Sequence, residues 1–298
     1  LKVRVTLSSN VIAARSVEHP ADALEVPFEL SAKDLPVGEH TLIAELLKPI
    51  PGATPDKRQA DTVAETTLIL RKLGPAPWVE ARIDDDGNLL IDNQPIFARG
   101  WYGSFVYGVS KSVIPAAFTP RTTNMMHGLT EGDTIPCFAS LCRLIDESKA
   151  KFDQPLDEEI KVKLRSAIAA TQPKRNVIGY YLSDEPECRG LSKYYLKRIY
   201  DFVRNEDPYR ACLVISRDPA NFTETCDIIC PHPYMNPQEF DDGSRRFGGP
   251  LKGIREVIST ACAQNDGSKV VWSMPQAFTY GGKYGRNPNL LESRWFAY

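Results

Sequence analysis

Hydrophobic and polar residues alternate in part along the first quarter of this chain. The alternation is clearest at residues 2–7 and recurs within 24–30 and 41–46, and 64–70 is a further predicted strand. A period of two predicts strands with one buried and one solvent-exposed face. Several short strands with turns between them indicate a small β-sandwich, which we expect to span residues 1–77.

A different pattern follows from residue 78 to the end of the chain, where helical and strand-like segments take turns. We predict helices at 160–168 and 196–203, where apolar residues recur at helical spacing. We predict buried strands at 177–182, 211–216, 227–230 and 269–274, which are short and apolar. Alternation at intervals of roughly 25 to 35 residues is typical of a (β/α)8 TIM-type barrel, which we expect over residues 78–298.

The barrel predicted from these elements is incomplete. No convincing third strand stands between the plausible second strand at 124–129 and the strand at 177, and the sequence ends in what we interpret as the seventh helix. An open barrel would expose strand edges and apolar surface. We therefore expect that the molecule holds further residues near 129–135 and beyond 298.

A hairpin is predicted just before the first barrel strand. Asp86-Gly87 is a strong two-residue turn signal, and Asp92-Asn93 supplies a second reversal. The acids at 84–86 lack the spacing of a calcium loop, so we interpret them as a solvated turn.

Two adjacent acids, Asp184 and Glu185, follow a run of apolar and aromatic residues without charge at 177–182 and precede Pro186. In a barrel of parallel strands the active site lies at the carboxyl ends of the strands, which makes these acids candidate catalytic residues. An alternative interpretation is that the pair caps the helix that follows.

Composition narrows the classes of function. The 298 residues are 42% hydrophobic and 25% charged, with a net charge of −2, which is typical of a soluble globular protein and argues against a general nucleic-acid binder. No apolar run reaches 18 residues, so no membrane span is predicted. Four scattered histidines disfavour a metal-dependent hydrolase, and we expect no metal or other cofactor. Seven cysteines are enough for disulfides, with one left unpaired or bonded outside this chain, and the single glycosylation sequon at Asn221 is the basis for expecting a secreted protein.

The order of these segments resembles the clan A glycoside hydrolases, notably family 2-like enzymes in which a (β/α)8 barrel follows immunoglobulin-like domains. The resemblance is carried by "DGNLLIDNQPIFARGWY" at 86–102 and "VIGYYLSDEPE" at 177–187. It implies that the protein acts on carbohydrate and that Glu185 is the general acid/base. Asp184 stands where this clan usually has Asn. Family 20 hexosaminidases have an Asp-Glu pair at the same strand end, which implies that Asp184 binds a sugar hydroxyl or supports an acetamido group.

The nucleophile that the resemblance implies has no obvious counterpart. The clan's second Glu follows the seventh strand, where this chain has Gln276. An amide cannot form the glycosyl ester or carry the required charge. The substrate's own acetamido group could attack instead, or the protein could bind sugar without cleaving it. A second carboxylate could also come from elsewhere, the candidates being Asp184, Glu187, Glu239, Asp241 and Asp242.

Residues at predicted strand ends could supply a sugar-binding surface. This clan often places a Tyr or His after the sixth strand, and aromatic rings stack on sugars, although each of these side chains could equally pack in the core. The candidate substrate-binding residues are Trp101, Tyr102, His232, Tyr234, Trp272, Gln276 and Phe278.

The leading hypothesis is a glycoside hydrolase that cleaves a β-linked glycan, with Glu185 donating a proton to the leaving oxygen. A carboxylic acid held near a neutral pKa by its apolar strand would suit this role. The alternative is a catalytically inactive extracellular glycan-binding or structural protein that keeps a glycosidase-like barrel.

Overall fold

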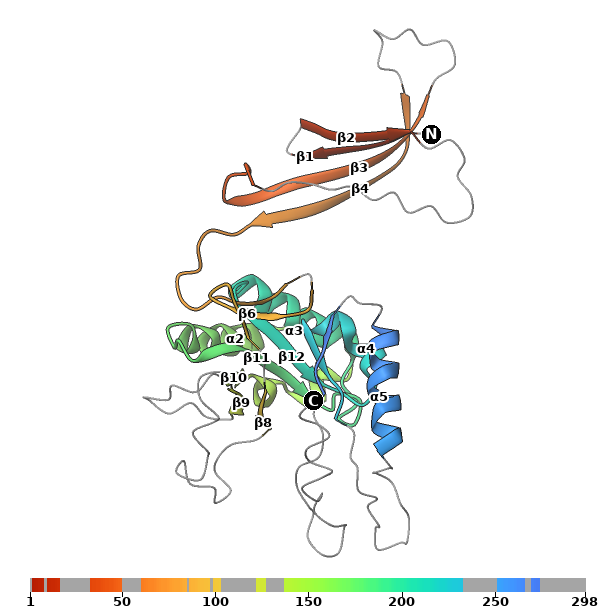
Figure 1. Ribbon diagram of the computed structural model, residues 1–298. Coiled ribbons are helices and arrows are strands. Elements are labelled where there is room, and N and C mark those ends of the chain that lie inside the picture. The colour runs from red at the N-terminus through yellow and green to blue at the C-terminus, as the bar shows by residue number, and fades with distance from the viewer. Residues whose placement is uncertain are drawn as a thin grey trace, which may run out of the picture. The chain divides into compact units, whose positions relative to one another are not determined.

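The computed structural model consists of two compact units, residues 1–76 and 77–298 (Figure 1). Within them the structure describes residues 2–7, 10–16, 33–49, 60–84, 86–96, 99–102, 122–126, 137–232, 251–265 and 269–273. The fold class is a β unit followed by an α/β unit.

The first unit contains a four-stranded antiparallel sheet in the order β2-β1-β3-β4. Its strands are β1 (Lys2–Leu7), β2 (Asn10–Ser16), β3 (Gly38–Pro49) and β4 (Ala60–Lys72). Arg4 and Glu45 face each other across β1 and β3, and both guanidinium contacts to the carboxylate measure 2.6 Å. Within the described residues this unit has one sheet, so the second layer of the expected sandwich stays a prediction.

The second unit is built on a seven-stranded sheet whose strands are all parallel and follow one another in chain order. They are β8 (Arg99–Tyr102), β9 (Thr122–Met126), β10 (Cys137–Ser140), β11 (Val177–Asp184), β12 (Ala211–Ile215), β13 (Ile228–Cys230) and β14 (Val270–Val271). A sheet wound in one direction with helical crossovers is the arrangement from which a TIM-type barrel is made. Pairing of β8 with β14, which would close it, is not seen among the described strands.

Strand β10 corrects the sequence analysis, which found no third strand. β10 pairs with β9 on one side and β11 on the other. Its four residues, Cys-Phe-Ala-Ser, are too few to show a period, and its first three are all buried, so no alternation marks it. Residues 127–136, near which we expected further residues, and residues 274–298 lie outside the described ranges.

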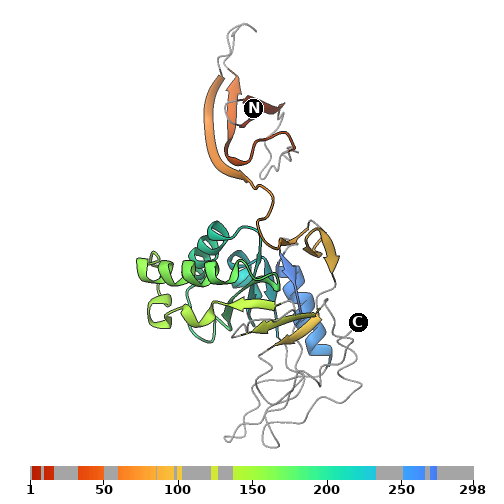
Figure 2. The same cartoon turned by 90° about the vertical axis from the view of Figure 1, so that its left-hand side faces the viewer.

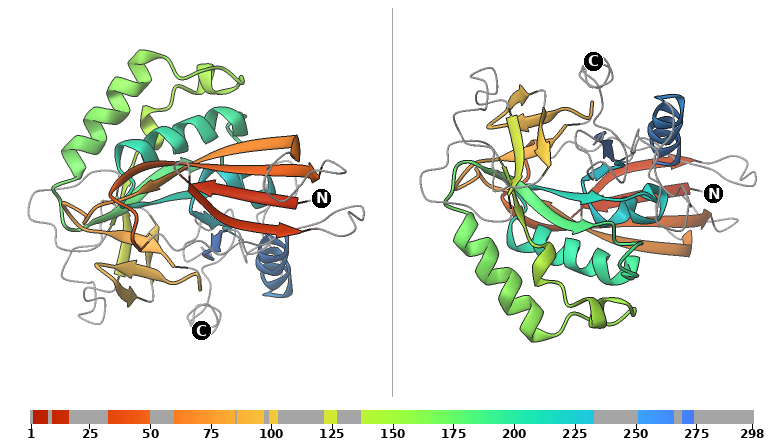
Figure 3. Two further views of the ribbon diagram at one scale, coloured as in Figure 1. Left: turned by 90° about the horizontal axis from the view of Figure 1, so that it is seen from above. Right: turned by 90° about the horizontal axis from the view of Figure 1, so that it is seen from below.

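Helices α2 (Glu158–Thr171) and α3 (Lys193–Glu206) confirm both predicted helices. They pack side by side against the sheet (Figures 1 and 3). Each begins at a side-chain cap: Asp157 accepts from the Ile160 amide at 2.9 Å, and Ser192 accepts from the Tyr195 amide at 3.4 Å. The remaining helical elements are η3 (Cys142–Leu144), α1 (Glu147–Ala150), α4 (Pro219–Phe222), η4 (Thr223–Thr225) and α5 (Leu251–Gln264).

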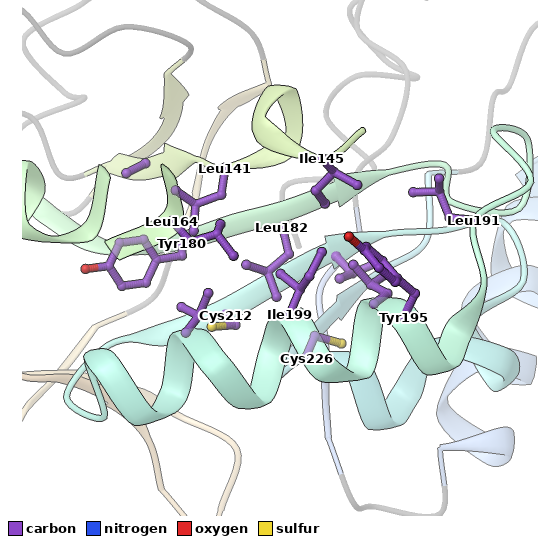
Figure 4. Close-up of a cluster of buried hydrophobic side chains, with 14 of the residues drawn as sticks. Leu141, Ile145, Leu164, Tyr180, Leu182, Leu191, Tyr195, Ile199, Cys212 and Cys226 are labelled. Atoms are coloured by element: carbon purple, nitrogen blue, oxygen red, sulfur yellow. The ribbon is translucent and has the colours of Figure 1, made fainter. Parts of the chain in front are cut away.

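The main core lies between the sheet and these helices (Figure 4). Leu164 of α2 and Ile199 of α3 are fully buried against Leu182 of β11. Burial of side chains of this size is worth about 1.5–3 kcal/mol each, so this layer fixes where the carboxyl end of β11 lies.

A second core covers the other face of the sheet. The predicted hairpin forms there as β5 (Ala81–Ile83), β6 (Leu89–Ile91) and β7 (Gln94–Ile96), drawn in orange in Figure 2. The Ala81 amide donates to the Tyr209 carbonyl at 2.8 Å, which places the hairpin at the amino-terminal end of β12. The opposite, carboxyl end of the strands is therefore the end available for a functional site.

Candidate active site

The segments that follow β11, β12 and β13 bring three charged or titratable side chains together. Glu185 follows β11, Arg217 lies two residues after β12, and His232 lies two residues after β13. Because these strands are parallel neighbours, their carboxyl ends meet at one edge of the sheet. The site is thus formed by residues distant in sequence, at the end where barrel enzymes carry their chemistry.

Glu185 is the centre of this cluster. Its Oε1 lies 2.5 Å from Nη2 of Arg217 and 3.1 Å from Nε2 of His232. The Glu185 side chain is 26% exposed and that of Arg217 is 31% exposed, whereas His232 is buried. One carboxylate oxygen therefore has two nitrogen neighbours while the side chain stays in partial contact with solvent.

The electrostatic surroundings keep Glu185 ionised. The close contact with His232, followed by the positive charge of Arg217, holds the pKa of Glu185 below its usual value, against the opposing effect of partial burial. The expectation of a pKa raised towards neutrality is therefore wrong for the protein without substrate. The apolar strand was visible in the sequence, but the two nitrogen groups contributed by neighbouring strand ends were not.

The backbone at Glu185 adopts the left-handed conformation, with φ of 43°. Two other described residues that are not glycine share a positive φ, Asp92 and Asn93, and both belong to types that tolerate it in turns. The Glu185 amide donates to the Ile215 carbonyl at 2.9 Å, and its own carbonyl accepts from the Cys188 amide at 3.0 Å. The chain therefore reverses at Glu185 itself, at a cost of about 1 kcal/mol for this residue type.

The alternative that the two acids cap the next helix is wrong. Helix α3 begins at Lys193, and its cap is Ser192. Asp184 is the last residue of β11, and its charge contributes to the surroundings of Cys142. Burial raises the pKa of Cys142 to about 11, with Arg189 opposing and Asp184 adding to the effect. The lowered pKa of Glu185 is also the opposite of what two converging carboxylates would produce.

Sequence reasoning missed Arg217 and the role of Ser216. Both directly follow a buried strand, which is the signal that identified Glu185, but a Ser-Arg pair in that place carries no motif. Glu187, considered above as a second carboxylate, accepts hydrogen bonds from the Ser216 hydroxyl at 2.9 Å and the Arg217 amide at 2.7 Å. Its two oxygens are thus engaged with the segment that carries Arg217.

The other predicted site residues are placed in part. Trp101 and Tyr102 lie in β8, the first strand of the sheet. Trp272 follows β14, is partly buried against the second core, and packs edge-on against Phe138, with ring centroids 5.9 Å apart. The remaining predicted residues lie outside the described ranges, namely Tyr234, Gln276, Phe278, Glu239, Asp241 and Asp242.

Asn221, the predicted glycosylation site, is exposed in α4, where its side-chain amide donates to Asp218 at 2.5 Å. Glycosylation there stays a prediction. None of the seven cysteines, all of which lie within the described ranges, forms a disulfide bond, and five of them are buried.

The part of the chain that the structure describes contains no group of three or more His, Cys, Asp or Glu side chains arranged to hold a metal ion. None of its helices has the length and hydropathy needed to cross a bilayer.

Comparison with known proteins gives no family assignment by sequence. No model of a known protein family matches the chain, and no curated protein matches it. Among solved structures it is similar to a β-D-glucuronidase of Dictyoglomus thermophilum, with 15% identity, a TM-score of 0.48 and coverage of 99% of this chain and 53% of that one.

Two further similar structures are also glycosidases. A GH2 β-galacturonidase of Eisenbergiella tayi has 11% identity and a TM-score of 0.47, with coverage of 94% of this chain and 52% of that one. A β-glucuronidase of Ruminococcus gnavus has 11% identity and a TM-score of 0.46, with coverage of 94% and 49%. The chain spans about half the length of these structures. At such identities, what each enzyme hydrolyses is a property of that enzyme.

Proposed function

We propose that this protein is a glycoside hydrolase in which Glu185 is the acid/base carboxyl group. The observation that carries the proposal is the placement of Glu185. It stands at the carboxyl end of the fourth strand of a parallel sheet wound in one direction, in a strained backbone conformation, with a partly exposed carboxylate. Strain of this kind persists where a site requires it.

Cleavage of a glycosidic bond needs a proton at the leaving oxygen and a means of stabilising the positive charge that develops on the sugar. Without substrate, the Glu185 carboxylate is ionised and in contact with Arg217 and His232. A sugar oxygen that displaces Arg217 from Oε1 would remove a cation and so raise the proton affinity of Glu185. Nε2 of His232 lies 3.1 Å from Oε1 of Glu185. It therefore stays close to the carboxyl group while Glu185 donates its proton to the leaving oxygen.

The second catalytic group is the open part of the proposal. Because both oxygens of Glu187 accept hydrogen bonds from the 216–217 segment, we exclude Glu187 as the attacking carboxylate. The remaining candidates are the substrate's acetamido group or one of Asp184, Glu239, Asp241 and Asp242. Asp184 is proposed to bind a sugar hydroxyl or to support such an acetamido group.

The competing proposal is a protein that binds glycans without cleaving them. It is favoured by the lowered pKa of Glu185, which suits a carboxylate that accepts hydrogen bonds from sugar hydroxyls better than one that donates a proton. Gln276 at the expected nucleophile position supports the same interpretation.

A panel of β-linked alkyl and 4-nitrophenyl glycosides discriminates between the two proposals. In the hydrolase, Glu185→Gln should lower kcat/KM on alkyl glycosides by about 10²–10⁴-fold and on nitrophenyl glycosides by less, because nitrophenolate leaves without a proton. Glu224→Gln, the same change at an exposed acid, is the matched control. If the wild type turns over none of the panel while glycan binding is lost in Glu185→Gln, the binding protein is the correct proposal.

A further inference from the structure

Glu187 joins the segment after β11 to the segment after β12. Its Oε2 accepts from the Ser216 hydroxyl at 2.9 Å, and its Oε1 accepts from the Arg217 amide at 2.7 Å. The Ser216 hydroxyl also accepts from the Asp218 amide at 3.0 Å. Three consecutive residues are therefore held by one carboxylate and the hydroxyl that it orients.

The same segment is fixed on its other side as well. The Ser216 amide donates to the Cys230 carbonyl at 3.1 Å, and Ser216 is fully buried. The backbone of Arg217 thus has little freedom, and its side chain reaches Glu185, two residues before Glu187 in the same loop. Two residues of one loop hold the two ends of Arg217: Glu187 holds its amide and Glu185 its guanidinium.

We infer that Glu187 is a positioning residue, which acts on the proposed reaction by holding Arg217 against the carboxylate of Glu185. The inference deepens the proposed hydrolase function and rests on it for its catalytic meaning. Glu187 itself need not touch the substrate. Its role is to keep the guanidinium at contact distance while leaving Glu185 exposed enough to meet a sugar.

Several charged groups surround Glu185 and must be separated from this effect. Arg217 faces it from the segment after β12 and His232 from the segment after β13. Cys188 lies in the same loop as Glu185. Burial, followed by the negative charges of Glu185, Glu187 and Asp184, raises the pKa of its thiol. A negative charge on Glu187 that acted directly on Glu185 would raise the proton affinity of Glu185, whereas a Glu187 that positions Arg217 would lower it.

The two possibilities predict shifts of opposite sign when Glu187 is removed. We would measure the pKa of Glu185 by NMR titration of protein labelled with ¹³C at the glutamate carboxyl carbon, with the resonance assigned by its absence in Glu185→Gln. In Glu187→Ala the pKa of Glu185 should rise towards its ordinary value, because Arg217 is released. In Glu187→Gln, which keeps one acceptor oxygen, the rise should be smaller. Glu224→Ala, an exposed acid removed at a distance, should cause no shift.

Ser216→Ala gives a test without any change of charge, and it serves if Glu187→Ala does not fold. Loss of the hydroxyl removes one of the two bonds that Glu187 makes, so the pKa of Glu185 should again rise. A fall in Glu187→Ala together with no change in Ser216→Ala would overturn the inference and leave Glu187 as a charge only. The titration needs no substrate, so this result is independent of the glycoside panel that decides the proposed function.

Discussion

A buried ion pair at the amino-terminal end of β12 gives the sharpest prediction about stability. Asp207 and Arg210 are 2% and 1% exposed, and the Arg210 guanidinium donates to Asp207 Oδ2 at 2.9 Å. The same oxygen accepts from the Tyr180 hydroxyl at 2.7 Å, and Arg210 also donates to the Gln172 carbonyl at 2.6 Å. The network ties β11, the end of α3 and the end of α2 together.

Replacing Asp207 with Asn keeps the shape of the side chain but leaves the Arg210 charge buried without a counter-charge. Removing one partner of such a pair costs about 3–5 kcal/mol. Tyr180→Phe should cost less, about 1.5 kcal/mol, because Arg210 still satisfies the oxygen that loses the hydroxyl. Asp201→Asn is the matched control, since this exposed acid on α3 pairs with Lys197 at the surface, where ion pairs contribute little.

Urea unfolding followed by tryptophan fluorescence measures these changes in the second unit, which contains Asp207 and Tyr180. All four tryptophans of the chain, at positions 78, 101, 272 and 295, lie in the second unit, so the signal reports that unit alone. This avoids treating a two-unit chain as one cooperative transition. If Asp207→Asn destabilised the protein no more than Asp201→Asn, the buried pair would not hold this end of the sheet, and the reasoning would be refuted.

Two further predictions concern β11 and its carboxyl end. Gly179→Ala should destabilise the second unit by about 1–3 kcal/mol in the same unfolding assay. The reason is that an added Cβ would lie 2.4 Å from the Phe138 ring and 2.5 Å from the Ala211 carbonyl oxygen. A stabilised variant would contradict this packing. Because the pKa of Glu185 is lowered in the folded protein, its ionised form contributes stability above its unfolded pKa, and that contribution is lost as the pH falls through its folded pKa. The difference in unfolding free energy between wild type and Glu185→Gln should therefore be smaller at pH 3 than at pH 7. A difference that is the same at both pH values would show that ionised Glu185 does not contribute to stability.

The sequence predicted the elements whose signal is local. Helices α2 and α3 carry apolar residues at helical spacing over 160–168 and 196–203, and β11 is uninterrupted by polar residues from Val177 to Leu182. Strand β10 was missed because four residues, three of them buried, show no period. Its place between β9 and β11 depends on pairing partners distant in the chain, and a sequence pattern does not display those partners.

The candidate site, too, could be predicted only in the part whose signal is local. Glu185 could be predicted because a charged residue at the end of a buried strand stands out locally. Its surroundings could not, since Arg217 and His232 reach it only through the order of three neighbouring strands. The predicted direction of its pKa was wrong for the same reason: burial was visible in the sequence, and the compensating charges were not.

The backbone of Glu185 adds an argument that neither periodicity nor motif supplies. A position that only had to end β11 and reverse the chain would be served by Gly or Asn, which adopt a positive φ at lower cost. A Glu at φ of 43° costs about 1 kcal/mol and still needs cationic or hydrogen-bonding partners for its partly buried charge. The structure supplies both partners from two other strand ends and fixes one of them through Glu187. Two contacts to the carboxylate of a residue with a strained backbone are better explained by a functional role of Glu185 Oε1 than by the geometry of the turn.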